Sequence, residues 1–148
     1  WSLSGERSLA EFFFDHLSAG QPVKGLTDRH FSPLWVGHLA SLLFEILEKE
    51  FKGLYHVSGS ESLSKYEFGR RLARRLGFDE TLVQPATSDE LPYVATRAPQ
   101  LTVDTGKLAQ ALGRRLPDVT AGLDGHYRQY RAGYPQQLRA MQMQEVSV

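Results

Sequence analysis

The chain has 148 residues, of which 17 are basic and 17 acidic, so its formal net charge is zero and it does not resemble a nucleic-acid or polyanion binder. The absence of cysteine excludes disulfides, thiolate metal sites and a cysteine nucleophile. With 41% apolar residues but no run long enough to span a bilayer and no signal-peptide pattern, we expect a globular, cytoplasmic protein without membrane contact.

The first third of the chain predicts two helices with a short strand between them. Residues 8–11, Ser-Leu-Ala-Glu, form a capping box, and Gly20 can end the helix that follows. Residues 22–26 are predicted to be a short strand. Serine followed by proline at 32–33 predicts the start of a second helix, which should run to about Glu50.

The middle of the chain predicts a strand and then a strongly signalled helix. Residues 54–58, Leu-Tyr-His-Val-Ser, are rich in strand-forming types and are expected to form a buried strand. Residues 64–67 are a second capping box, flanked by Leu63 and Phe68 as a hydrophobic staple. The helix should end at Gly77.

The last part predicts one more extended segment and two more helices. Residues 82–85 are expected to be extended, 87–90 a short helical turn, and 93–102 a loop. Asp104 is expected to cap a helix that ends near Gly113.

Pro117 and Asp118 open the final helix, and the tail from residue 136 is expected to fray. Helices that alternate with strands in this order indicate an α/β fold with parallel pairing. Three short strands make a thin sheet, which would more naturally extend a larger sheet supplied by another segment.

No motif in the chain predicts a catalytic, cofactor-binding or metal-binding residue. There is no glycine-rich phosphate loop and no tyrosine with a lysine four residues later. The five histidines do not fall at metal-ligand spacing.

Three places carry residues with possible binding chemistry. Asp28 could accept a hydrogen bond from a sugar hydroxyl and pair with Arg29, although the residues alone favour a simple turn. Arg97, in a proline-stiffened loop, suits a diphosphate, and a plain surface arginine is the equal alternative. Four arginines at 70, 71, 74 and 75 form a basic face that favours a solvated helix surface over a phosphate contact.

Three stretches follow one another in the order of a known family: "TDRHFSPLWVGHLASLL", "GLYHVSGSESLSKYEFGRRLARRLG" and "ATRAPQLTVDTGKLAQALG". Together they resemble the C-terminal half of the extended short-chain dehydrogenase/reductases, above all the dTDP-4-dehydrorhamnose reductase group. The resemblance implies the C-terminal part of an NAD(P)-binding, Rossmann-like α/β enzyme, with short parallel strands and a mostly helical small lobe. It covers roughly residues 1 to 131.

The resemblance also implies roles for residues and partners. Asp28, Arg29, Ser32 and Pro33 would line or shape the substrate side, and Arg97 would lie nearest the diphosphate of a nucleotide-sugar substrate. Residues 1–135 would be the substrate-binding half and 136–148 a tail. NAD(P)H and the catalytic tyrosine would belong to a separate N-terminal Rossmann half, so this chain alone is expected to reduce nothing.

Two other functions remain open at this point. The same stretches also resemble the non-catalytic regulatory subunit of methionine adenosyltransferase, and an epimerase or dehydratase of the superfamily is a third possibility. Because the chain begins at Trp1 and lacks the glycine motif, we expect a fragment. Its uncovered apolar surface should then favour self-association, and a homo-oligomer of the parent is possible.

Overall fold

The computed structural model describes residues 1, 8–90, 98–134, 136–137 and 140. Within these residues the elements follow in this order: α1 (Leu9–Ser18), β1 (Val23–Leu26), β2 (His30–Phe31), α2 (Val36–Glu48), β3 (Leu63–Ser64), α3 (Lys65–Leu76), the 3-10 turn η1 (Glu80–Leu82), β4 (Val83–Ala86), the 3-10 turn η2 (Ser88–Glu90), β5 (Gln100–Leu101), α4 (Gly106–Leu112) and α5 (Val119–Arg131). No helix among these residues is long and apolar enough to cross a membrane.

The strands form two small sheets. In one, β1 runs parallel to β4, with Val23 opposite Val83 and Leu26 opposite Ala86. In the other, β2 lies between β3 and β5, antiparallel to the first and parallel to the second. The mixed α/β class with short parallel strands is therefore confirmed, and the antiparallel β2–β3 pair is an addition that the sequence pattern did not indicate.

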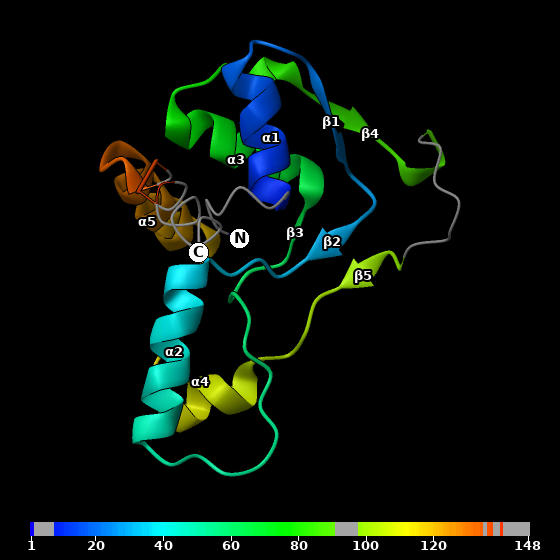
Figure 1. Cartoon of the computed structure of the whole chain (residues 1–148). Helices are drawn as coiled ribbons and strands as arrows, with labels where there is room; N and C mark the ends of the chain where they lie inside the picture. Colours follow the sequence, from blue (N-terminus) through cyan, green and yellow to red (C-terminus); the bar gives the residue numbers. More distant parts are fainter. Residues whose placement is uncertain (2–7, 91–97, 135, 138–139, 141–148) are drawn as a thin grey trace, which may run out of the picture.

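Helix α3 is the centre of the larger core. Its Phe68, Leu72 and Ala73 side chains have no exposed surface, and the helix packs against α1, α5, β1 and β4 (Figure 1). The predicted capping box is present, since Ser64 Oγ accepts from Glu67 N at 3.1 Å and Glu67 accepts from Ser64 N at 3.1 Å. The helix ends, as expected, on left-handed Gly77 at φ 80°.

Three further predicted helix ends are confirmed, and one of the capping residues is adjusted by one position. Ser8 and Glu11 cap α1 reciprocally, and Asp118 Oδ1 accepts from Ala121 N at 2.8 Å at the start of α5. Helix α4 begins at Gly106, whose N–H donates to Asp104 Oδ1 at 2.7 Å, so the predicted aspartate acts one residue before the cap position. Helix α4 ends at Gly113, which adopts the left-handed conformation.

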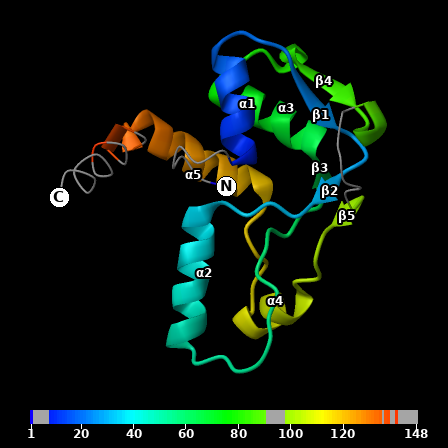
Figure 2. The ribbon, with the colours of Figure 1, turned by 45° about the vertical axis from the view of Figure 1, so that its right-hand side comes forward.

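A second, smaller core joins α2 to α4. Leu42, Leu108 and Leu116 are buried at its centre, with Ile46 and Tyr55 packed against them. Figure 2 shows this pair of helices extending away from the α1–α3–α5 group. The molecule therefore has two packed groups of helices, one large and one small.

The predicted helix start at Ser32–Pro33 is wrong. Helix α2 begins only at Val36, after Trp35, which provides no side-chain cap. The reason is a pairing with the first residue: Trp1 N donates to Leu34 O at 2.9 Å, and Val36 N donates to Trp1 O at 2.9 Å. These two hydrogen bonds hold the chain extended where the local sequence alone favours a helix.

The predicted buried strand at 54–58 is also wrong. No strand of the described residues lies beside it, and its polar groups reach the neighbouring helix instead. Lys107 Nζ donates to Leu54 O at 2.7 Å, and His56 Nδ1 lies 3.1 Å from Asp104 O. A strand needs a ladder partner, and within the described residues this segment has none.

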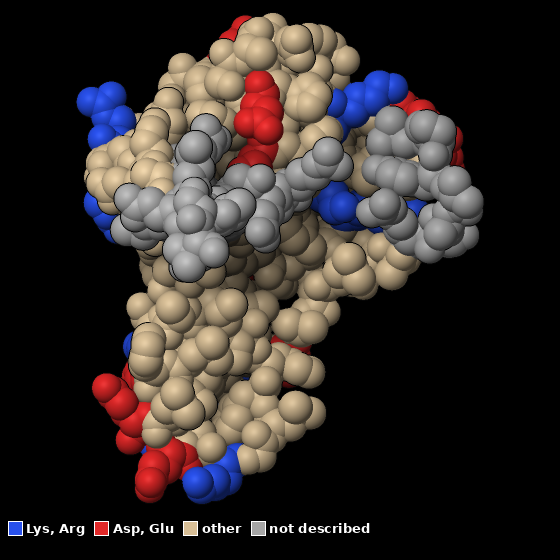
Figure 3. Space-filling model, viewed as in Figure 1, with Lys and Arg blue, Asp and Glu red and all other residues tan. Residues whose placement is uncertain are grey.

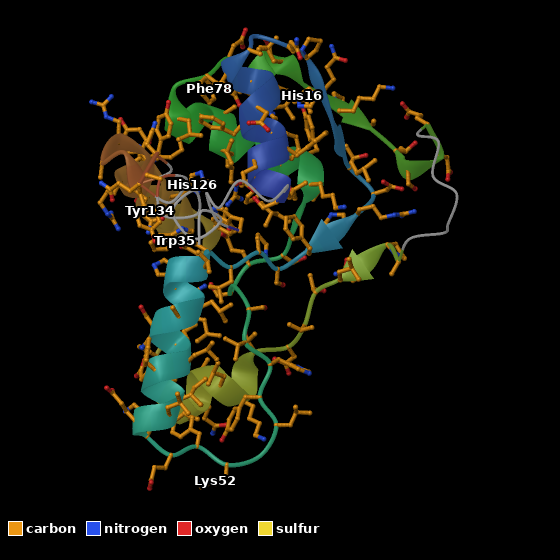
Figure 4. The ribbon with its side chains drawn as sticks, in the orientation of Figure 1. His16, Trp35, Lys52, Phe78, His126 and Tyr134 are labelled. Atoms are coloured by element: carbon orange, nitrogen blue, oxygen red, sulfur yellow. The ribbon has the colours of Figure 1, made fainter. Side chains whose placement is uncertain are left out.

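The junction between the two groups of helices contains a buried histidine. His126 on α5 lies near Trp35, at the point where α2 begins (Figure 4), and it has no exposed surface. Neither ring nitrogen has a hydrogen-bond partner among the described residues. Burial chiefly, and the amino group of Trp1 secondly, lower the pKa of His126 from 6.5 to about 4.

Because this histidine stays neutral in the fold but is protonated in the unfolded chain below about pH 6.5, it makes stability depend on pH. The contribution is fully present above pH 6.5 and is lost as the pH falls towards 4. We expect the free energy of unfolding to drop by about 3 kcal/mol over this interval from His126 alone. Urea unfolding of wild type and His126→Gln at pH 7.5 and pH 4.5 tests this, and equal pH slopes in the two proteins would contradict it.

Candidate functional site

Two of the predicted site residues meet a third residue at the ends of β1 and β4. The ladder continues past β1, with Thr27 N donating to Ala86 O at 2.9 Å, so the turn after β1 lies against η2. There Ser88 N donates to both carboxylate oxygens of Asp28, at 3.1 and 3.2 Å, and Ser88 Oγ donates to Asp28 Oδ2 at 2.6 Å. We call Asp28, Arg29 and Ser88 the Asp28 cluster.

Arg29 completes the Asp28 cluster. Its Nη1 lies 3.0 Å from Asp28 Oδ2, and its Nη2 donates to Ser88 Oγ at 2.5 Å. The Arg29 side chain is 16% exposed and the Asp28 side chain 32%. The pairing that the sequence suggested is therefore present, and it includes a serine 60 residues away in the chain from the aspartate.

The cluster has a defined charge state with one open donor. The Ser88 hydroxyl above all, then the Ser88 N–H and the Arg29 guanidinium, hold the pKa of Asp28 below its ordinary 3.8. The carboxylate is therefore ionised at neutral pH. Arg29 Nε is buried and has no hydrogen-bond partner among the described residues.

In the chain, Ser32 and Pro33 follow β2, whereas Asp28 and Arg29 precede it. Ser32 is half-buried and Pro33 is buried. The Pro33 carbonyl lies so close to Gly59 that a side chain there would overlap it. Among the described residues, no hydrogen bond joins Ser32 or Pro33 to the Asp28 cluster, so the four residues at 28, 29, 32 and 33 do not form one bonded group.

Arg97 lies outside the described residues, but both flanks of its segment are anchored at this end of the molecule. On one side is η2, held by Ser88 in the Asp28 cluster. On the other, Pro99 O accepts from His30 N at 3.0 Å, and β5 continues the pairing with β2. The described residues that flank 91–97 on both sides therefore lie close to Asp28 and Arg29.

Ser88 is the residue of the site that the sequence reading missed. The turn at 87–90 was predicted, and it is closed by Glu90 Oε1, which accepts from Thr87 N at 3.1 Å. The available signal was a pair of hydroxyl residues, Thr87 and Ser88, directly after the end of β4. Nothing local indicated that Ser88 would face Asp28, because that contact depends on the β1–β4 register.

The Asp28 cluster can bind polar ligands. A carboxylate accepts from hydroxyl groups, and a guanidinium donates to oxygen acceptors. The described residues contain no group of acidic or histidine side chains that could hold a metal ion. None of the described helices follows a strand through a glycine-rich turn, so these residues do not fit a dinucleotide cofactor.

The hydroxyl of Ser88 can be tested as the main cause of the low Asp28 pKa. We expect Ser88→Ala to raise that pKa towards 3.8, because the largest stabilising hydrogen bond to the ionised carboxylate is lost. A pH titration followed by carboxyl-carbon NMR measures it. Asp79, whose pKa is lowered separately by Thr81, should titrate identically in both proteins. An unchanged Asp28 pKa in the variant would contradict the assignment.

Comparison with characterised proteins points to one family. The RmlD substrate binding domain model matches residues 2–132. A probable low-salt glycan biosynthesis reductase of Haloferax volcanii is 26% identical over 117 residues, which cover 77% of this chain and 39% of that protein.

Solved structures share the fold. A dTDP-4-dehydrorhamnose reductase from Clostridium acetobutylicum matches with a TM-score of 0.77 at 18% identity, over 86% of this chain and 45% of the other. The enzyme of that name from Bacillus anthracis, in complex with NADP, matches with a TM-score of 0.73 at 18% identity, over 83% and 43%. The chain spans less than half the length of these relatives. With its α/β fold, and with a family model matched over residues 2–132, the chain belongs to the RmlD substrate-binding domain family.

Proposed function

We propose that this chain is the substrate-binding part of an NAD(P)-dependent reductase that acts on a nucleoside-diphosphate 4-keto-6-deoxy sugar. The observation that carries the proposal is the family match over residues 2–132. The dTDP-4-dehydrorhamnose reductases that share the fold support it, and the one from Bacillus anthracis is in complex with NADP. The polar, half-buried Asp28 cluster supplies suitable binding chemistry.

In this proposal the residues position the substrate. Asp28, ionised and held by Ser88, accepts hydrogen bonds from sugar hydroxyls. Arg29 keeps that carboxylate in place and offers its buried Nε–H to a ligand oxygen. Ser32 and Pro33 shape the adjoining wall, and Arg97 pairs with the diphosphate.

Bond making is assigned to a nucleotide-binding half outside this chain. In the proposal, NAD(P)H and the proton donor belong to that half. The contribution of this chain is to hold the sugar in the reactive orientation, which by itself accounts for a large part of an enzyme's rate. The reductase name of the Haloferax relative supports this function over a regulatory subunit.

The exposed apolar surface of α2 supports the proposal that a nucleotide-binding half packs against this chain. Leu43, Phe44 and Leu47 are 46%, 67% and 71% exposed, although the opposite face of the same helix is buried against α4. Figure 3 shows that charged side chains are sparse along this part of the molecule and gather at its lower end. A contiguous set of exposed leucine and phenylalanine side chains on one helix is typical of a surface that a partner covers. We assign the covering surface to the nucleotide-binding half.

The substrate role can be tested in a protein that carries both halves. We expect Asp28→Asn to raise KM for the nucleotide sugar about tenfold, with a smaller change in kcat, because a charge-assisted hydrogen bond to the substrate is weakened. Asp79→Asn, a carboxylate away from the cluster, is the matched control. Initial rates of NADPH oxidation with a dTDP-4-keto-6-deoxy sugar give both constants. Turnover by the present chain on its own would contradict the assignment of bond making to another half.

The exposed face of α2 predicts how the chain behaves alone. We expect it to self-associate, because the uncovered apolar side chains are driven together in water. Replacing Phe44 and Leu47 by lysine should reduce this association strongly. Phe12→Ser, which removes an exposed aromatic ring from α1, should leave it unchanged. Light scattering at several concentrations measures the association, and a monomeric wild-type chain would count against the proposed covering surface.

A further inference from the structure

A basic cavity lies between α3 and α5, away from the Asp28 cluster. Its volume is about 340 Å³, and it is lined by Arg71, Arg74, Arg75, Thr120 and Leu123. In Figures 1 and 2, α5 lies on the other side of α3 from β1 and β4, the strands that carry the Asp28 cluster at their ends. The cavity is therefore a second candidate site, and the proposed function does not use it.

All three arginines have acidic partners: Glu80 pairs with Arg74, Glu61 with Arg71 and Asp124 with Arg75. Glu61 Oε1 lies 3.0 Å from Arg71 Nη1, while Glu61 Oε2 accepts from Val119 N at 3.0 Å and so ties this arginine to the start of α5. Arg75 Nε donates to Asp124 Oδ1 at 2.5 Å. The Arg75 guanidinium also stacks over the Tyr127 ring, 3.9 Å from its centre. The guanidinium groups of Arg71 and Arg75 are thus oriented before any ligand arrives.

These pairs leave donors available. Among the described residues, Arg75 hydrogen-bonds only through Nε, and Arg71 only through Nη1. A guanidinium carries five N–H donors, so most of those on both arginines remain. The pairs that link α3 to α5 therefore use one nitrogen atom of each guanidinium group. Among the described residues, its other nitrogen atoms have no hydrogen-bond partner.

The side chains that line the cavity carry positive charge. Its lining contains three arginines and no carboxylate. The acidic partners Glu61, Asp124 and Glu80 lie outside that lining. The three lining arginines and these three carboxylates give a net charge of 3 − 3 = 0, so the positive charge is confined to the lining itself.

We propose that this cavity binds the phosphate group of a small organic phosphate. Guanidinium groups bind phosphate oxygens in a paired, planar geometry, and the Thr120 hydroxyl adds a further donor. Leu123 supplies an apolar wall for the carbon part of the ligand. The volume lies at the lower end of the range found for small-molecule sites.

The direct test is a titration of the protein with inorganic phosphate and with phenyl phosphate at constant ionic strength. Calorimetry gives the affinity, and the arginine Nε–H signals in NMR spectra give the location. We expect saturable binding, and phenyl phosphate should bind several-fold more tightly than inorganic phosphate because Leu123 contacts its ring. Arg71→Gln and Arg75→Gln should each weaken binding about tenfold, the effect of one charged hydrogen-bond partner.

Arg70→Gln is the matched control, because Arg70 shares Glu80 with Arg74 on the same helix but does not line the cavity. It should change the affinity less than twofold. Asp124→Asn should strengthen binding, since it removes the negative charge that competes for Arg75. A purely structural role of Arg75 predicts no such gain. Thermal unfolding of each variant confirms that it is folded.

Three results would overturn the proposal: no saturable binding of either phosphate, equal weakening by Arg70→Gln and Arg75→Gln, or no preference for phenyl phosphate. The proposed reductase function does not depend on this outcome, because the Asp28 cluster and the cavity share no residue.

Discussion

The burial of α3 is the constraint on which the rest of the structure depends. One face of this helix is fully enclosed, and its neighbours approach closely because two glycines leave room for them. A side chain at Gly25 on β1 would come within 2.7 Å of the Tyr66 backbone, and one at Gly69 would come within 2.6 Å of the Phe13 ring. Strand β1, helix α1 and helix α3 therefore fit together in one arrangement. The parallel β1–β4 pair lies on this support.

The position of the Asp28 cluster follows from that packing. The capping box at Ser64 sets the first turn of α3, and directly beside it Lys65 N donates to Arg29 O at 3.2 Å. The same core holds β4 in register with β1, which brings Ser88 to Asp28. The three polar side chains of the Asp28 cluster are thus positioned by apolar packing in which they take no part. A polar cluster positioned in this way is pre-organised for a ligand.

The outer surfaces of helices α3 and α2 differ in character. The polar face of α3 meets acidic groups of η1 and α5, as in the ion pair of Arg75 with Asp124, and encloses a basic cavity with α5. The outer face of α2 is apolar and is left uncovered by the described residues. Charged surface is stable in water, whereas an uncovered row of leucine and phenylalanine is not. The second surface is therefore the one that we propose the nucleotide-binding half to cover.

The sequence by itself determined most of the helix ends, except the start of α2, and the general class of the fold. Ser64 with Glu67, and Gly77 after them, act within a few residues, so local pattern identifies them reliably. Only the tertiary structure decided that residues 32–35 stay extended, because the hydrogen bonds to Trp1 cross 33 residues of chain. It likewise decided that 54–58 has no ladder partner here and that Ser88 joins Asp28. Contacts of that range depend on register and packing, which no local pattern encodes.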